Sequence, residues 1–226
     1  MTTLKPTHSA IVNGHTMYKK NLYDANDYKH DVIKKSTNAK LGKKILKGIW
    51  KNHPMYTVTL EARATCTDEC EHYLDCYDNN MPFAHRLKAN QALIDKMAIE
   101  LDKLDKKHPL GYVVRLHILG DFYSVDYVKW WKKQLQTRPN LKIYGYSRNH
   151  VTSKYAKVRS IAKEIVKVRL QFADRFKIRF SNLPSDTLSA NSEHVSTQGF
   201  TCPQQTGKTA SCGTCGLCWT STKPVI

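Results

Sequence analysis

Three things are scarce in this chain of 226 residues: acidic side chains, long apolar runs, and cysteines outside two short stretches. No apolar run is long enough to cross a bilayer, so we expect no membrane-spanning helix and no membrane partner. Met1 is followed by polar residues and lysines rather than by an apolar segment, so no secretory signal peptide is expected. Both absences favour a cytoplasmic protein whose cysteines stay reduced.

The shortage of acidic side chains leaves a large positive charge. The chain has 19 Asp and Glu against 36 Lys and Arg, which gives a formal net charge of +17. Such an excess attracts polyanions over long distances. The positive side chains are concentrated before residue 54 and along residues 154–169. We therefore expect contact with nucleic acid, and a solvated basic surface without a dedicated partner is the alternative.

No cysteine lies between Cys76 and Cys202, so the seven cysteines form two groups. Disulfides usually tie distant segments together in secreted chains, whereas closely spaced thiolates surround a single soft metal centre. The spacing therefore predicts iron–sulfur or zinc sites. The loop cysteines are Cys66, Cys70 and Cys76, and the tail cysteines are Cys202, Cys212, Cys215 and Cys218.

Strand-like and helix-like segments alternate after residue 55. The segment 112–119 is apolar enough to be buried on both faces, as in a parallel sheet. Ser124 fits an N-cap at the start of a helix. The expected strands are residues 56–60, 112–119, 141–146 and 177–181, and the expected helices are residues 83–107, 124–135 and about 152–172.

This alternation with short loops predicts an α/β fold with a parallel sheet. The units are too few for an eight-fold barrel, so we expect a partial, open β/α barrel. An amphipathic turn or short helix is expected within residues 38–50, and a short strand near residues 194–197. The expected organisation is a basic N-terminal extension (1–54), the partial barrel (55–190) and a Cys-rich metal-binding tail (191–226).

Polar residues follow several of the expected strands, at the edge where parallel sheets carry their chemistry. His117 and Asp121 stand on either side of one strand end and are candidate catalytic residues for proton transfer. Alternatively, His117 points into the sheet and Asp121 caps the next helix. The candidate cofactor-binding residues at these strand ends are Gly120, Asp121, Ser147 and Asn182.

The loop cysteines directly follow the first expected strand. Three thiolates can hold three irons of a [4Fe–4S] cluster and leave the fourth iron open to a small chelating molecule. Zinc is the alternative metal, with His72 or His85 as its fourth ligand. A tail cysteine could also close the open iron, so that both groups share one cluster.

The order of a strand, Cys66-x3-Cys70, an aromatic residue and a third cysteine resembles the radical S-adenosylmethionine family. The resemblance implies a radical-SAM-like partial barrel with its [4Fe–4S] cluster on this loop. It also implies S-adenosylmethionine as a cofactor, held by its amino group at the turn Leu119–Asp121. That turn has one glycine and an Asp where the family has two glycines and a Glu. Five residues separate Cys70 from Cys76, where the family usually has two.

A closer resemblance covers most of the chain. With the loop cysteines, it rests on Asn38–Gly42, Arg115–Phe122, Trp130, Tyr144–Ser147 and Gly216–Trp219. These motifs resemble a phage-borne family catalogued as "gene product eighty-eight", which is itself largely uncharacterised and is thought to be related to radical S-adenosylmethionine barrels. The resemblance implies a fold and a cluster, and for a phage protein it implies the host cytoplasm.

The tail cysteines combine Cys212-x2-Cys215-x2-Cys218 with a remote Cys202-Pro203. This pattern resembles half of a bacterial ferredoxin, with the remote cysteine placed before the triplet. Four thiolates make a closed site, which suits a structural or electron-transferring cluster. A zinc knuckle is the alternative.

Two functions follow from these patterns. The first is an iron–sulfur protein on a partial barrel that acts on or binds nucleic acid, as a radical-SAM-like enzyme with an unknown substrate. The second is a non-enzymatic iron–sulfur or zinc module that contacts nucleic acid or a host protein.

Overall fold

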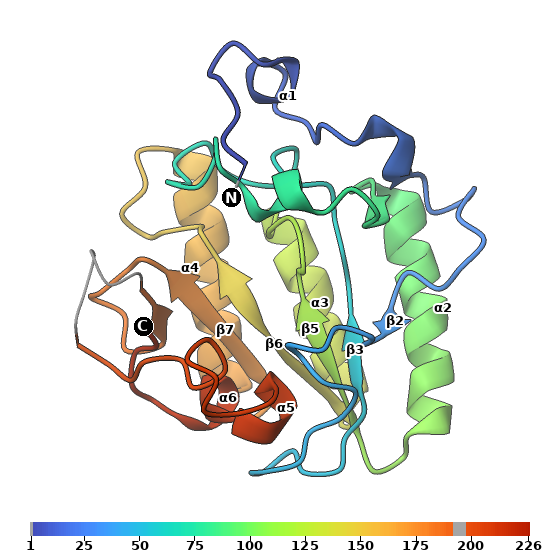
Figure 1. The fold of residues 1–226 in the computed structure, drawn as a ribbon. Helices are drawn as coiled ribbons and strands as arrows, with labels where there is room; N and C mark the ends of the chain where they lie inside the picture. Colours follow the sequence, from blue (N-terminus) through green and yellow to red (C-terminus); the bar gives the residue numbers. More distant parts are fainter. Residues whose placement is uncertain (1, 192–197) are drawn as a thin grey trace.

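The computed structural model describes residues 2–191 and 198–226, and it has one main sheet (Figure 1). The strand order is β2-β3-β5-β6-β7-β8, with β2 antiparallel to β3 and the other neighbours parallel. The predicted α/β fold with a mainly parallel sheet is therefore confirmed. Within the described residues the sheet does not close into a barrel, and the radical-SAM-like partial barrel is not confirmed. The strands are β2 (Lys34–Lys35), β3 (Met55–Thr57), β5 (Tyr112–Leu116), β6 (Leu141–Ser147), β7 (Phe176–Ser181) and β8 (Ser189–Ala190).

Three long helices, α2 (Gln91–Lys107), α3 (Val125–Thr137) and α4 (Ala156–Gln171), cover one face of this sheet (Figure 1). The parallel strands β3, β5, β6 and β7 follow one another in chain order. Right-handed crossovers between strands in sequential order place their helices on the same face. The larger apolar core lies between these helices and the sheet.

The helix starts depend on capping side chains. The helix expected from Phe83 begins only at Gln91, because the Asn90 side chain accepts a hydrogen bond from the Leu93 N–H at 3.1 Å. Residues 86–87 instead form the short strand β4. The predicted N-cap Ser124 is confirmed by its hydrogen bond from the Tyr127 N–H at 3.1 Å.

The helix expected from residue 152 or 153 begins at Ala156. Ser153 lies before the helix because its hydroxyl donates to the Glu69 carboxylate and accepts from the Tyr155 N–H. This contact joins the start of α4 to the loop that carries the loop cysteines.

The other face of the sheet is covered by residues 41–50 and by the tail, which form a second apolar cluster. Trp50 and Trp219 stack there with ring centroids 5.6 Å apart. Residues 38–50 form turns and not the short helix that was the alternative expectation. The tail contains two short helices, α5 (Cys212–Cys215) and α6 (Leu217–Thr220). The strand expected near residues 194–197 lies outside the described residues.

The N-terminal segment packs over the loop that carries the loop cysteines. Tyr18 donates a hydrogen bond to the Asn79 carbonyl at 2.6 Å, and Thr16 donates to the Asp78 carboxylate at 2.8 Å. In the described part of the chain, no helix is both long and apolar enough to span a bilayer. The remaining elements are α1 (Ser9–Val12), η1 (Lys19–Asn21), β1 (Leu22–Tyr23), η2 (Tyr77–Asn80) and β4 (Arg86–Leu87), where β4 pairs with β1.

Candidate metal centre

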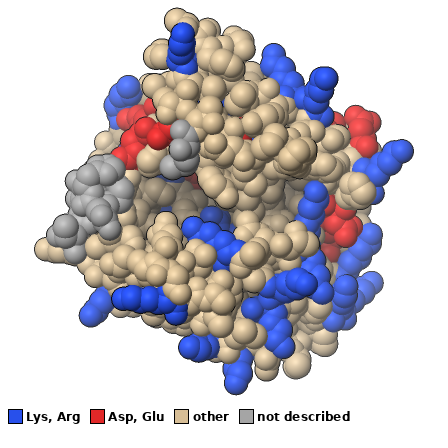
Figure 2. Space-filling view, in the orientation of Figure 1, with Lys and Arg blue, Asp and Glu red and all other residues tan. Residues whose placement is uncertain are grey.

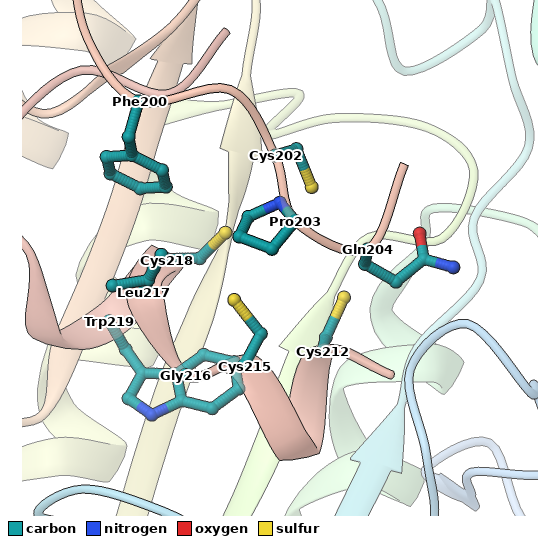
Figure 3. A pocket seen from close by; sticks show the side chains of 10 residues that line it. All are labelled: Phe200, Cys202, Pro203, Gln204, Cys212, Cys215, Gly216, Leu217, Cys218 and Trp219. Atoms are coloured by element: carbon teal, nitrogen blue, oxygen red, sulfur yellow. The ribbon is translucent and has the colours of Figure 1, made fainter. Parts of the chain in front are cut away.

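The four tail cysteines lie around one small cavity. Cys212 and Cys215 lie on α5, Cys218 lies on α6, and Cys202 lies on the segment that precedes both helices. Figure 3 shows that their four sulfur atoms point towards a common space. The fold therefore brings the remote Cys202 next to the three cysteines of the triplet, as the sequence pattern predicted.

Local backbone geometry makes this arrangement possible. The Ser211 side chain caps α5, because it accepts a hydrogen bond from the Thr214 N–H at 3.2 Å. Gly216 then turns the chain between the two helices with φ +76°, a conformation in which a side chain is strained. At Gly213 a Cβ atom would stand 2.4 Å from the Lys44 carbonyl oxygen, so glycine allows the close approach of residues 40–46.

Arg179 fastens the tail to the sheet. Its side chain is buried on β7 and donates hydrogen bonds to four backbone carbonyls of the tail and of β8 at 2.7–3.1 Å. A charged donor that satisfies several buried carbonyls rigidifies the segments that carry them. These four acceptors are the carbonyls of Cys218, Ser189, Lys223 and Ser221, and the Leu217 carbonyl is a fifth acceptor at 3.5 Å.

Burial and nearby positive charges have opposite effects on the pKa values of the tail cysteines. Burial raises the pKa of Cys212 to about 11, and Lys40 and Arg115 act in the opposite direction. Burial also raises the pKa of Cys218, and this rise is opposed by the Tyr146 hydroxyl, 3.0 Å from its sulfur, and by Arg179. The nearby cations offset this rise only in part, so both thiols stay protonated near neutral pH, and a bound cationic metal would be needed to hold them as thiolates.

The loop cysteines also lie within electrostatic reach of one another. Burial raises the pKa of the Cys66 thiol, and Asp121, Cys76 and Cys70 raise it further. Burial likewise raises the pKa values of Cys70 and Cys76, whereas Arg148 lowers that of Cys70 and Arg63 lowers that of Cys76. The fold therefore gathers these three thiols on one loop.

The turn Gly120–Asp121 contacts this loop through Thr65, the residue before Cys66. The Thr65 hydroxyl accepts from the Asp121 N–H at 3.1 Å and donates to the Glu61 carbonyl at 2.7 Å. The Asp121 carboxylate accepts from the Phe122 and Arg148 N–H groups, both at 2.6 Å, and burial raises its pKa to about 6. Asp121 therefore joins two strand ends, and the cap of α3 is Ser124 instead.

A Gly120→Ala variant is expected to lose about 1–3 kcal/mol of unfolding free energy through overpacking. Gly120 has φ +83°, and an added Cβ would lie 2.5 Å from the Thr65 hydroxyl and 2.7 Å from the Leu60 Cβ. Gly207→Ala is the matched control, because Gly207 has φ +73° and open space around it. Urea unfolding of both variants separates crowding from backbone strain. Equal losses of unfolding free energy in the two variants would show that crowding against Thr65 and Leu60 does not contribute to the destabilisation.

The candidate catalytic residue His117 points towards α3. Its Nε2 atom lies 3.1 Å from the Tyr127 hydroxyl, and its ring packs against Phe122 with centroids 4.8 Å apart. Burial, followed by the charge of Arg115, lowers its pKa to about 3. His117 therefore lies where the alternative reading of the sequence placed it, inside the helix-facing core.

His117 should make the fold less stable in acid. Because its pKa is about 3 when folded and about 6.5 when unfolded, the stability that it contributes above pH 6.5 is lost as the pH falls. Between about pH 7.5 and pH 5, His117→Gln should lose about 2 kcal/mol less unfolding free energy than the wild type. Urea unfolding at the two pH values measures this. The same pH dependence in both proteins would contradict the assignment.

A larger cavity of about 480 Å³ is lined by three tail cysteines and by none of the loop cysteines. Figure 2 shows the molecule hollowed at its centre in this region, with basic side chains at the rim. Its wall includes Cys202, Cys212 and Cys218 of the tail, and His72 and Tyr77 from the loop that carries the other three cysteines.

Arg115 lies at this cavity and was not among the predicted site residues. Its guanidinium lies over the rings of Tyr144 and Tyr146, 5.5 Å and 4.8 Å from their centroids, and donates to the His117 carbonyl. The sequence signal was present, since Arg115 interrupts an otherwise apolar strand. The residues that contact Arg115 come from the next strand and from the tail, so the sequence of its own strand could not indicate them.

The predicted cofactor-binding residues are divided between two surroundings. Asn182, with φ +52°, lines the large cavity. Gly120, Asp121 and Ser147 do not line it, and the Ser147 hydroxyl accepts from the Asn149 side chain and N–H at 3.1 Å. Their role in cofactor binding stays a prediction.

Neither cysteine group forms a ready site for a metal ion. Within residues 2–191 and 198–226, no group of three or more His, Cys, Asp or Glu side chains could hold one. The iron–sulfur and zinc assignments therefore stay predictions for all seven cysteines.

Comparison with known proteins gives one match. No curated protein and no solved structure matches the chain, and none of the comparisons links it to radical S-adenosylmethionine enzymes. The model of the family described as gene product 88 matches residues 31–221, a span that runs from just before β2 to just after α6 and includes all seven cysteines. The chain therefore belongs to the gene product 88 family.

Proposed function

We propose that this protein is an iron–sulfur protein whose tail cysteines hold a [4Fe–4S] cluster. The observation that carries the proposal is the convergence of four cysteine side chains, from α5, α6 and the preceding segment, on one cavity (Figure 3). Cys202, Cys212, Cys215 and Cys218 would each bind one iron. All four irons would then have a protein ligand, which suits electron transfer or a structural role.

The charges around the tail cysteines support an anionic centre. Four thiolates and the sulfides of a cluster carry net negative charge, which needs compensation when it is partly buried. Lys40 and Arg115 act on Cys212, and Arg179 acts on Cys218. Tyr146 adds a hydroxyl 3.0 Å from the Cys218 sulfur, the kind of outer contact that tunes a metal–thiolate centre.

Zinc is the alternative metal for the tail cysteines. A single zinc ion draws four sulfurs to about 2.3 Å from one point. In a cluster each cysteine binds a different iron, so the sulfurs stand further apart. Four cysteines that line one cavity are compatible with either arrangement, and acid-labile sulfide distinguishes the two.

We further propose that Cys66, Cys70 and Cys76 hold a second [4Fe–4S] cluster with one open iron. An open iron can bind a small chelating molecule and pass it an electron, and S-adenosylmethionine is the candidate from the resemblance. A cavity of about 480 Å³ borders this loop at His72 and Tyr77, and none of the three loop cysteines lines it. Without such binding, the protein would be a non-enzymatic iron–sulfur module.

The test begins with protein purified without oxygen and analysed for iron, acid-labile sulfide and zinc. The reduced protein is then incubated with S-adenosylmethionine and assayed for 5′-deoxyadenosine, with a Cys66→Ser/Cys70→Ser variant as the control. Sulfide with iron supports the cluster, and 5′-deoxyadenosine formed by the wild type alone supports the open site. Zinc without sulfide contradicts the proposed tail cluster. A wild-type protein that neither binds nor cleaves S-adenosylmethionine contradicts the enzymatic function.

A further inference from the structure

A second polar cavity, of about 580 Å³, lies at the edge of the sheet formed by β2. The tail is attached beside β8, at the opposite edge, and this cavity shares no lining residue with the one lined by three tail cysteines. On the side of the molecule where β2 and α2 lie, Figure 2 shows many Lys and Arg side chains. The lining residues of the cavity are Lys29, His30, Asp31, Lys34, Lys35 and His85.

The residues that line this cavity carry more basic than acidic side chains. Three lysines and two histidines face one carboxylate, and none of these five basic side chains has an ion pair in the described part of the chain. Lys34 is half-buried, and burial lowers its pKa. Burial also lowers the pKa of His85, and Lys34 and His30 lower it further. Like charges held together in this way favour a bound anion.

The segment that carries these side chains is fixed to the fold. The Glu100 carboxylate on α2 accepts hydrogen bonds from the Val32 and Ile33 N–H groups at 2.7–3.0 Å. Lys96, also on α2, donates to the Tyr28 carbonyl. The backbone of this segment is therefore held in place before any ligand arrives, which lowers the entropy lost on binding.

Two tyrosine rings that do not line the cavity contact side chains that do. The Tyr28 hydroxyl lies 2.9 Å from His85 Nδ1, and the Lys34 ammonium lies 4.9 Å from the centroid of the Tyr28 ring. The rings of Tyr23 and His85 are 5.0 Å apart, and those of Tyr28 and His30 are 5.5 Å apart. These contacts orient the imidazoles and Lys34 around one opening.

We infer that this cavity is a phosphate-binding site, formed chiefly by Lys34, Lys35 and His85. Lysines and a histidine around an open cavity are the donors that phosphate oxygens need. The phosphates of a nucleic acid and those of a free nucleotide share this chemistry. A net charge of +17 favours the polymer, because it attracts polyanions. The site is independent of the proposed clusters.

The test uses the full chain and three probes: a labelled single-stranded oligonucleotide, ATP and inorganic pyrophosphate. Binding of the oligonucleotide is measured by fluorescence anisotropy over a series of salt concentrations, and binding of the small probes by calorimetry. The pocket variant is Lys34→Gln/Lys35→Gln. The matched control is Lys132→Gln/Lys133→Gln on α3, which removes the same charge elsewhere. His85→Gln serves as a second pocket variant if the first does not fold, as judged by circular dichroism.

The pocket variant should bind the oligonucleotide about tenfold more weakly than the control variant. The slope of the logarithm of the binding constant against the logarithm of the salt concentration should be shallower by about 1.4, the value for two lost phosphate contacts to a single strand. Loss of ATP or pyrophosphate binding in the pocket variant alone, with no oligonucleotide binding by the wild type, assigns the site to free phosphates. Equal affinities in the pocket and control variants, or no binding of any probe, would overturn the inference. Iron content, measured in parallel, keeps this result separate from the cluster proposal.

Discussion

Replacing Cys215 by serine is expected to remove about four iron atoms per chain, the content of one [4Fe–4S] cluster. A serine hydroxyl stays protonated at neutral pH and is a harder ligand than a thiolate, so it does not replace cysteine on a soft centre. Cys215 lies on α5, with its sulfur directed at the other three tail sulfurs (Figure 3). If the loop cysteines hold the second cluster, about half of the iron should remain.

Gln204→Ala is the control for Cys215→Ser, because Gln204 lines the same cavity without offering sulfur. This variant should keep the iron and sulfide content of the wild type. The measurement is iron and acid-labile sulfide per chain after purification without oxygen. Unchanged iron in Cys215→Ser, or the same loss in Gln204→Ala, would contradict the assignment. Loss of all iron would show that the loop cysteines hold no separate cluster, either because both groups share one cluster or because only the tail holds one.

The Arg179→Met variant is expected to lose about 3 kcal/mol or more of unfolding free energy and to release the tail from the sheet. Methionine fills similar space but donates no hydrogen bond, so the carbonyls of Cys218, Ser189, Lys223 and Ser221 lose their donor. Each buried acceptor left without a partner costs about 1–3 kcal/mol, reduced where water enters. Loss of the tail cluster should accompany the loss of stability.

Lys177→Met is the control for Arg179→Met, because Lys177 is two residues away on β7 and is less buried. Unfolding in urea can be followed by tryptophan fluorescence, since Trp219 of the tail stacks on Trp50. The Arg179 variant should unfold at a lower urea concentration than the Lys177 variant, with an earlier change in the tryptophan signal. Equal midpoints for the two variants would show that Arg179 does not hold the tail.

The strands could be predicted because their apolar content is dense and continuous. Tyr112–Leu116, Leu141–Ser147 and Phe176–Ser181 lie close to the expected ranges, since burial on both faces leaves few polar positions. The start of α2 was predicted too early. Apolar spacing near Phe83 suggested a helix, but Asn90 caps the helix later and the preceding residues pair with β1.

The surroundings of the candidate site could be predicted only in part. Cysteine spacing indicated the two groups, because metal ligands on one loop are close in sequence. The partners of Asp121 could not be predicted, since Thr65 lies 56 residues before it and Arg148 lies 27 residues after it. Arg179 likewise acts on carbonyls about 40 residues later, after the tail has folded over β7. A period of two along a strand indicates two faces, but not what covers each.

The most direct test of the central claim is the chemical analysis of the wild-type protein, purified and kept without oxygen. We predict iron and acid-labile sulfide in equal amounts, at least about four of each per chain, with broad visible absorbance that bleaches on reduction. Zinc bound in place of iron, with no sulfide, would contradict the assignment of the tail cysteines to an iron–sulfur cluster.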